Sequence, residues 1–330
     1  MSDTFDRIRL DRRTALKLTA GAAALGVFAP FAARAFPTQP VTLIVPYAPG
    51  ATDQLARALT GQMSQTLGKP VLVETRPGGG GTIGASYVAK NAKPDGHTLL
   101  FSFTAPLTVA PHQNPLPYAF ADLKAVARVT LGPNMMAARP DAPFKSAKEL
   151  IAYAKANPEK VNFGSAGAGS TTHLAGEAFA RAAGVKLNHI PFQGVRPAVT
   201  AAVGGTVDLV IGLAQAIWPQ VQGKRLTAIA QLGDTRAGVI PDVPTFKEAG
   251  VDFAMPASIG AWVPKATPDA VVQQLAAAIE QASKSAEFVA FAKRTYTEVG
   301  FAGPAAFQSQ IAAENALILK LLTELGMAKK

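Results

Sequence analysis

The segment 41-VTLIVPYAPGATDQLARALTGQMSQTLGKPVLVE-74 contains the pattern of a complete strand–helix–strand unit. Residues 41–45 form a short β-branched apolar run of the kind that makes a buried strand. Residues 52–67 place leucine and methionine at four-residue spacing before Gly68 and Pro70, which predicts a helix with one buried face. Residues 71–74 are the next apolar run. The unit is therefore typical of an α/β protein.

The same alternation continues along the rest of the chain. We expect two α/β domains, each a mainly parallel sheet flanked by helices. The last helices have no sheet of their own, so we expect them to pack on the first domain, with the chain crossing between domains near 130–138 and 254–262. The remaining predicted strands are 98–103, 161–164, 207–211 and 226–231, and the helices are 82–89, 147–156, 170–183, 197–204, 268–283 and 304–325.

Composition excludes several classes of protein. The chain has 330 residues, 48% hydrophobic and 16% charged, which excludes disorder and is long enough for two domains. It has no cysteine, which excludes disulfides, thiol nucleophiles and cysteine-bound metals. The net charge is +10, but lysine and arginine are dispersed without aromatic interleaving, so no nucleic-acid partner is expected.

The N-terminus has the pattern of an export signal. Arg12 and Arg13 precede an apolar stretch at 18–33, and the small-residue site Ala-Arg-Ala follows at 33–35. Paired arginines before a weakly hydrophobic segment are typical of a twin-arginine signal peptide, here residues 1–35, which is cleaved. We expect a mature protein that begins at Phe36, lies in the periplasm and inserts no segment into the membrane.

Two motifs suggest enzyme chemistry, but each is weak. Gly79-x-Gly81-x-x-Gly84 fits a dinucleotide fingerprint, yet the following strand lacks the acidic residue that holds a ribose, which favours a glycine turn for close packing. A hydrolase using Ser165 or Ser170 with His173 rests on residue types alone. The four histidines lack metal-ligand spacing. We therefore expect no catalytic residues, no metal and no cofactor.

Two loops share one design that suits an anionic ligand. Residues 46–53 and 164–172 each run from a strand into a helix N-terminus with small residues and hydroxyls, and neither contains lysine or arginine. Such a site binds a carboxylate or phosphate through N–H groups at the positive end of the helix. The alternative is that both are ordinary capping loops, with Thr52 and Ser170 as the N-caps. Two such loops in two domains favour a ligand clamp.

Six segments in this order resemble the Bug-type receptors, the periplasmic substrate-binding proteins of tripartite tricarboxylate transporters. The resemblance covers essentially the whole mature chain, and its strongest segments are PYAPGATDQLAR at 46 and FGSAGAGSTTHLAGEAF at 163. The other four are GKPVLVETRPGGGGTIGASYVAK at 68, KPDGHTLL at 93, IPFQGVRPAVTAAVGGTVDL at 190 and IPDVPTFKEAG at 240.

The resemblance implies a two-domain periplasmic-binding-protein fold of the type II, or Venus-flytrap, class. It implies a binding protein without catalysis that captures a small carboxylic acid and delivers it to membrane transporter subunits; a ligand-sensing module is an alternative. We expect the protein to be a monomer. We expect domain 1 at 36–135 and 258–330 and domain 2 at 136–257. The implied ligand-binding residues are Tyr47, Ala48, Gly50, Thr52, Asp53, Ser165, Ala166, Gly169, Ser170 and Thr171.

Two departures from the family pattern affect the expected site. Gly50 is followed directly by Ala51, so the first loop is one residue shorter than usual. Phe192 and Gln193 stand where the family usually has an aromatic–basic pair, which removes a cation.

Overall fold

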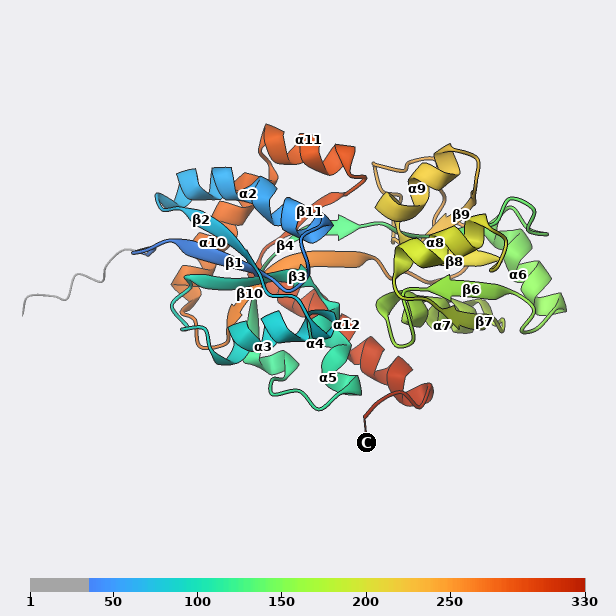
Figure 1. Cartoon of the computed structure of the whole chain (residues 1–330), viewed down its shortest axis with the longest axis horizontal. Coiled ribbons are helices and arrows are strands. Elements are labelled where there is room, and N and C mark those ends of the chain that lie inside the picture. The colour runs from blue at the N-terminus through green and yellow to red at the C-terminus, as the bar shows by residue number, and fades with distance from the viewer. Residues whose placement is uncertain (1–35, 330) are drawn as a thin grey trace, which may run out of the picture. The chain divides into compact units, whose positions relative to one another are not determined.

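The structure is a computed structural model that describes residues 36–329 (Figure 1). The predicted export signal and its cleavage site, residues 1–35, lie outside the described residues. All the helices and strands belong to a compact unit that begins at Gln39. They form two sheets, one with six strands and one with five.

The first sheet has the strand order β11-β4-β10-β3-β1-β2. In Figure 1, α2 lies on one side of it and α3 and α4 lie on the other. Its strands are β1 (Val41–Val45), β2 (Val71–Thr75), β3 (Thr98–Phe103), β4 (Leu123–Gly132), β10 (Ala257–Pro264) and β11 (Val299–Ala302). Its helices are α2 (Ala51–Leu67), η1 (Gly79–Gly81), α3 (Thr82–Lys90), α4 (Ala105–Thr108), α5 (Ala110–Gln113), η2 (Phe120–Asp122), α10 (Asp269–Ser283) and α11 (Ala286–Arg294).

The second sheet has the order β7-β6-β8-β5-β9 and is covered on both faces. Successive side chains of one strand point to opposite faces of a sheet. Met136 packs with α6 and α7, whereas its neighbour Met135 packs with α8 and α9. Its strands are β5 (Asn134–Ala138), β6 (Asn162–Ser165), β7 (Asn188–Pro191), β8 (Leu209–Leu213) and β9 (Thr227–Gln231). Its helices are α6 (Ala147–Ala156), α7 (Thr171–Ala183), α8 (Val195–Val203) and α9 (Ala214–Gln222).

Both sheets are mixed, which corrects the expectation of mainly parallel sheets. β1 is parallel to β2 and β3, and β6 is parallel to β7 and β8. The strands that connect the two sheets create the antiparallel pairs. β4 runs into β5 with only Pro133 between them, and β10 returns between β3 and β4, antiparallel to both. The ribbon of β4 and β10 therefore links the two sheets.

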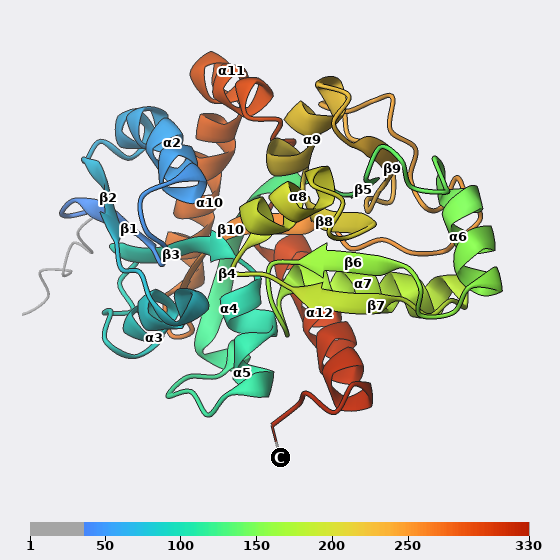
Figure 2. The same cartoon turned by 45° about the vertical axis from the view of Figure 1, so that its right-hand side comes forward.

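The last helix, α12 (Pro304–Glu324), contacts both sheets' cores, whereas the late helices were expected to pack on the first domain only. Phe307 and Ile311 pack with the first sheet, and Ile318 and Leu322 pack with the core of the second. A 21-residue helix is about 32 Å long, so one apolar stripe reaches both cores. Figure 2 shows α12 passing α4 and α5 towards α7.

Candidate functional site

The first predicted loop, residues 46–50, connects β1 to the N-terminus of α2. The N-cap of α2 is Gly50, which supplies no side-chain cap, so the first N–H groups of this 17-residue helix have no capping side chain. Thr52 was proposed as the N-cap but lies inside the helix. It is only 7% exposed, and its hydroxyl has no partner among residues 36–329. The end of α2 can thus offer N–H and O–H donors to an anion.

Tyr47 anchors this loop to the end of β3. Its hydroxyl lies 3.0 Å from the Ser102 Oγ, and its ring packs edge-on against Phe103 at 5.9 Å. Burial raises the pKa of the Tyr47 phenol to about 12, so it stays neutral. Ala48, by contrast, is exposed at the loop tip.

The glycine motif after β2 supports the same loop and confirms the packing interpretation. A Cβ on Gly84 would lie 2.7 Å from the Pro46 Cβ, closer than side chains approach each other. A Cβ on Gly81, where φ is +101°, would lie 3.2 Å from the Tyr47 ring. These glycines therefore let α3 and η1 approach residues 46–47.

Asp53 is already paired within α2. Both of its carboxylate oxygens accept from the Arg57 Nε, at 3.2 and 3.0 Å, and the pair spans one helical turn. The Asp53 side chain is 8% exposed, whereas that of Arg57 is 57% exposed. An acidic residue in the first turn also favours the helix dipole. Asp53 therefore stabilises the N-terminal end of α2.

The second predicted loop, residues 165–170, is held mostly by its own hydrogen bonds. The Ala166 N–H donates to the Thr172 Oγ1 at 2.8 Å, and the Gly169 N–H donates to the His173 Nδ1 at 3.0 Å. Ser170 is the N-cap of α7, as its capping interpretation predicted, because its Oγ accepts from the His173 N–H. These groups shape the loop at the N-terminus of α7.

Thr171 differs from its neighbours in this loop. Its hydroxyl has no partner among the described residues, and it lines a cavity. Of the five residues predicted here, Thr171 is the one whose side-chain donor faces open space.

Neither Ser165 nor Ser170 is hydrogen-bonded to the side chain of His173, as a hydrolase using His173 would require. Ser165 is fully buried, and its Oγ lies 2.6 Å from the His189 Nε2 rather than against His173. The Ser170 Oγ accepts from the backbone N–H of His173 and lies 3.1 Å from the Thr172 Oγ1, while the His173 Nδ1 accepts from the Gly169 N–H. Within residues 36–329, no group of acidic and histidine side chains could hold a metal ion.

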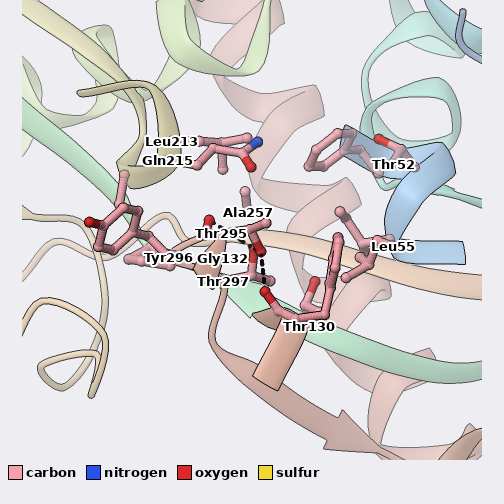
Figure 3. A pocket seen from close by; sticks show the side chains of 15 residues that line it. Thr52, Leu55, Thr130, Gly132, Leu213, Gln215, Ala257, Thr295, Tyr296 and Thr297 are labelled. Atoms are coloured by element: carbon pink, nitrogen blue, oxygen red, sulfur yellow. Dashed lines mark hydrogen bonds between the residues drawn. The ribbon is translucent and has the colours of Figure 1, made fainter. Parts of the chain in front are cut away.

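Two cavities are lined by residues of the β4–β10 ribbon. The smaller, the Thr52 pocket, has a volume of about 30 Å³, and Figure 3 shows Thr52 and Leu55 facing Leu213 and Gln215 across it. The larger, which we call the Arg128 cavity, has a volume of about 460 Å³ and includes Thr171. Only the larger is in the range of small-molecule sites, about 300–1,000 Å³. Phe103 and Ala257 line both, so the two cavities adjoin.

Arg128 brings a positive charge to the larger cavity. Its Nε donates to the Gly300 carbonyl at 2.7 Å, and its Nη1 donates to Gln310. No carboxylate of the described chain pairs with it, and burial lowers the pKa of its guanidinium. Arg128 was not predicted as a site residue because β4 was not predicted, although a single arginine inside the apolar run 123–132 is a usable signal.

Glu314 lies on another wall of the same cavity. Its Oε1 accepts from the hydroxyls of Thr104 at 2.5 Å and Thr108 at 3.1 Å. Burial raises the pKa of its carboxyl group, which favours the neutral form. Asp234, which also lines the cavity, pairs with the Lys247 Nζ at 2.6 Å, whereas Arg128 has no carboxylate partner among the described residues, so the cavity suits an anionic ligand.

Comparison with known proteins identifies the family. Residues 55–323 match the family described as the tripartite tricarboxylate transporter family receptor. The chain belongs to this receptor family. It is 36% identical over 283 residues to Protein BugT of Bordetella pertussis, covering 84% of this chain and 86% of BugT. This confirms the predicted resemblance.

Solved structures of the receptor family confirm the two-domain α/β fold. A TctC solute-binding protein from Polaromonas superimposes with a TM-score of 0.80 at 30% identity, covering 88% of this chain and 99% of that one. MatC from Rhodopseudomonas palustris, solved with bound malate, has a TM-score of 0.70 at 31% identity, covering 87% and 100%. Within residues 36–329, none of the helices combines the length and apolar character needed to cross a membrane.

Proposed function

We propose that this receptor captures a small dicarboxylic acid in the periplasm and delivers it to the membrane subunits of a tripartite transporter. The observation that carries the proposal is the Arg128 cavity, where an unpaired guanidinium and the N-terminus of α7 line the same space. Both attract negative charge. The family relation supports a binding role rather than catalysis.

One carboxylate group of the ligand binds at the two helix N-termini. The first N–H groups of α2 lack a capping side chain, and Thr52 and Thr171 offer hydroxyls without partners in the described chain. Several N–H and O–H donors at a helix end satisfy a carboxylate without a cation. The ten residues predicted from the sequence thus divide into direct donors and residues that hold the loops.

The second carboxylate group binds Arg128. A guanidinium carries five N–H donors, and the contacts to Gly300 and Gln310 use only its Nε and Nη1 sides. A carboxylate in the cavity supplies the missing counter-charge of a partly buried cation. MatC, which is 31% identical, was solved with malate, a dicarboxylic acid.

The two domains close around the ligand by a hinge. We propose domain 1 at 36–135 and 258–330 and domain 2 at 136–257, with closure by rotation about the connecting strands. The mature protein acts as a monomer after export through the twin-arginine route. It acts without a cofactor or metal.

The proposed function is tested by calorimetry with the purified protein and four probes. L-malate and L-lactate share a 2-hydroxy acid end, but only malate has a second carboxylate; citrate and glucose complete the set. We expect saturable binding of malate, much weaker binding of lactate, and no binding of glucose. Binding should also raise the unfolding temperature. Heat from none of the carboxylic acids, with no change in unfolding temperature, would contradict the proposal.

A further inference from the structure

Two imidazole rings are stacked directly beneath the second ligand loop. The rings of His173, on α7, and His189, on β7, lie 3.7 Å apart between centroids at an interplanar angle of 16°. The Phe163 ring packs against His189 at 4.9 Å. We call His173 and His189 the histidine stack. Its rings come from a helix and from the edge strand of the second sheet, and β6, which leads into the loop, precedes both in the chain and pairs in parallel with β7.

Each imidazole holds one end of the loop at 165–170. At the far end, the Gly169 N–H donates to the His173 Nδ1 at 3.0 Å. At the near end, the Ser165 Oγ lies 2.6 Å from the His189 Nε2. Gly169 has a φ of +72° and adjoins Gln113 so closely that a Cβ would lie 2.1 Å from its Nε2. A side chain at position 169 would therefore collide with Gln113 unless the Gln113 side chain moved.

The contact to Gly169 fixes the protonation state of His173. An imidazole nitrogen accepts a hydrogen bond only when it carries no proton. The His173 Nε2 faces the Glu177 Oε1 at 3.6 Å, so the ring proton belongs on that side. A proton on Nδ1 would place two N–H groups against each other at 3.0 Å and break the loop contact.

The charged groups around the stack are few. Glu177 lies beside His173, and the titratable group nearest to His173 is the stacked His189. Burial and the neighbouring His173 lower the pKa of His189 to about 4, while Glu177 opposes the shift. His189 is thus neutral near pH 7 and adds no charge to the stack.

We propose that His173 is a positioning residue whose unprotonated Nδ1 holds the α7 loop in its binding conformation, so that acidification releases the carboxylate ligand. The proposal rests on the proposed function, because the loop ends at the helix N-terminus that receives a carboxylate. His173 is 7% exposed and does not itself line the Arg128 cavity. It acts through Gly169.

The test compares L-malate affinity between pH 8 and pH 5.5 in the parent and two variants. In His173→Asn the side-chain Oδ1 takes the place of Nδ1 as acceptor but does not titrate. In His173→Phe the ring remains and the acceptor is lost. Protonation of malate itself affects all three proteins equally. Dividing the malate affinity of the parent by that of His173→Asn at each pH therefore isolates the effect of protonating the His173 imidazole.

We expect His173→Asn to bind malate within a few-fold of the parent at pH 8 and to fall less on acidification. The parent should lose a further factor of about 5 to 100, the range for leaving a buried donor without its acceptor. His173→Phe should bind weakly at both pH values. Parallel pH profiles for the parent and His173→Asn would overturn the proposal.

A measurement without ligand separates this inference from the proposed function. Nitrogen NMR of the imidazoles should show an unprotonated, hydrogen-bonded Nδ1 at pH 8, and the Gly169 amide signal should shift with the titration of His173. A proton on Nδ1 at pH 8 would overturn the inference even if malate binds. A Gly169 amide signal that does not change as the pH is lowered would also overturn the inference. If malate does not bind at all, the proposed function fails, whatever the NMR measurement shows.

Discussion

Replacing Arg128 by glutamine tests whether the ligand has a second carboxylate group. Glutamine keeps an N–H donor for the Gly300 carbonyl or for Gln310 but removes the charge. A hydrogen bond to a charged group contributes about 1.5–3 kcal/mol, so malate affinity should fall about 10- to 150-fold. The lactate affinity should stay within about 2-fold, because lactate has no second carboxylate for Arg128 to bind.

Calorimetry with malate and lactate on the same preparations measures both effects. Arg181→Gln is the matched control, because Arg181 lies on the surface and pairs with Glu324. Thermal unfolding of each variant checks that the fold persists. An equal loss for malate and lactate would show that Arg128 only supports the fold, and an unchanged malate affinity would show that no carboxylate reaches it.

Three further predictions concern the loops, export and closure. In calorimetry, Thr52→Val and Thr171→Val should each weaken malate binding about 5- to 100-fold, because the ligand carboxylate loses a hydroxyl donor. The control Lys69→Ala, just beyond the C-terminal end of α2, should bind like the parent. Parent-like binding by both valine variants would place the ligand elsewhere. Replacing Arg12 and Arg13 together by lysine should leave the precursor in the cytoplasm, as judged by cell fractionation, and normal export would exclude the twin-arginine route. Small-angle scattering should show a smaller radius of gyration with saturating malate, and an unchanged radius would argue against hinge closure.

The sequence predicts those elements whose pattern is local. Residues 41–45 and 147–156 match β1 and α6 at both ends, because a short β-branched run and a Ser146 cap mark them clearly. β4, β5 and β10 were not predicted, because their pairing joins residues far apart in the chain, as Ala138 with Leu209 and Gly132 with Ala257 show. The mixed character of the sheets follows from those strands, and no local pattern reveals it.

The residues of the candidate site also divide into those with a local sequence signal and those without one. The two strand–helix loops are visible in sequence, since glycines and hydroxyls before an amphipathic helix are a local signal. The Arg128 side chain reaches the site only through β4, and the histidine stack needs α7 and β7 to be packed together. Sequence patterns therefore predict the N–H and hydroxyl donors at the helix ends, but they do not predict the positions of Arg128 and the histidine stack, which depend on tertiary packing.

A crystal structure of the protein with bound malate would show directly whether both carboxylate groups bind where we propose. We expect one carboxylate within hydrogen-bond distance of the Thr171 hydroxyl and of N–H groups in the first turn of α2 or α7, and the other against the Arg128 guanidinium. A malate molecule that is bound with full occupancy but touches neither helix N-terminus nor Arg128 would contradict the proposal.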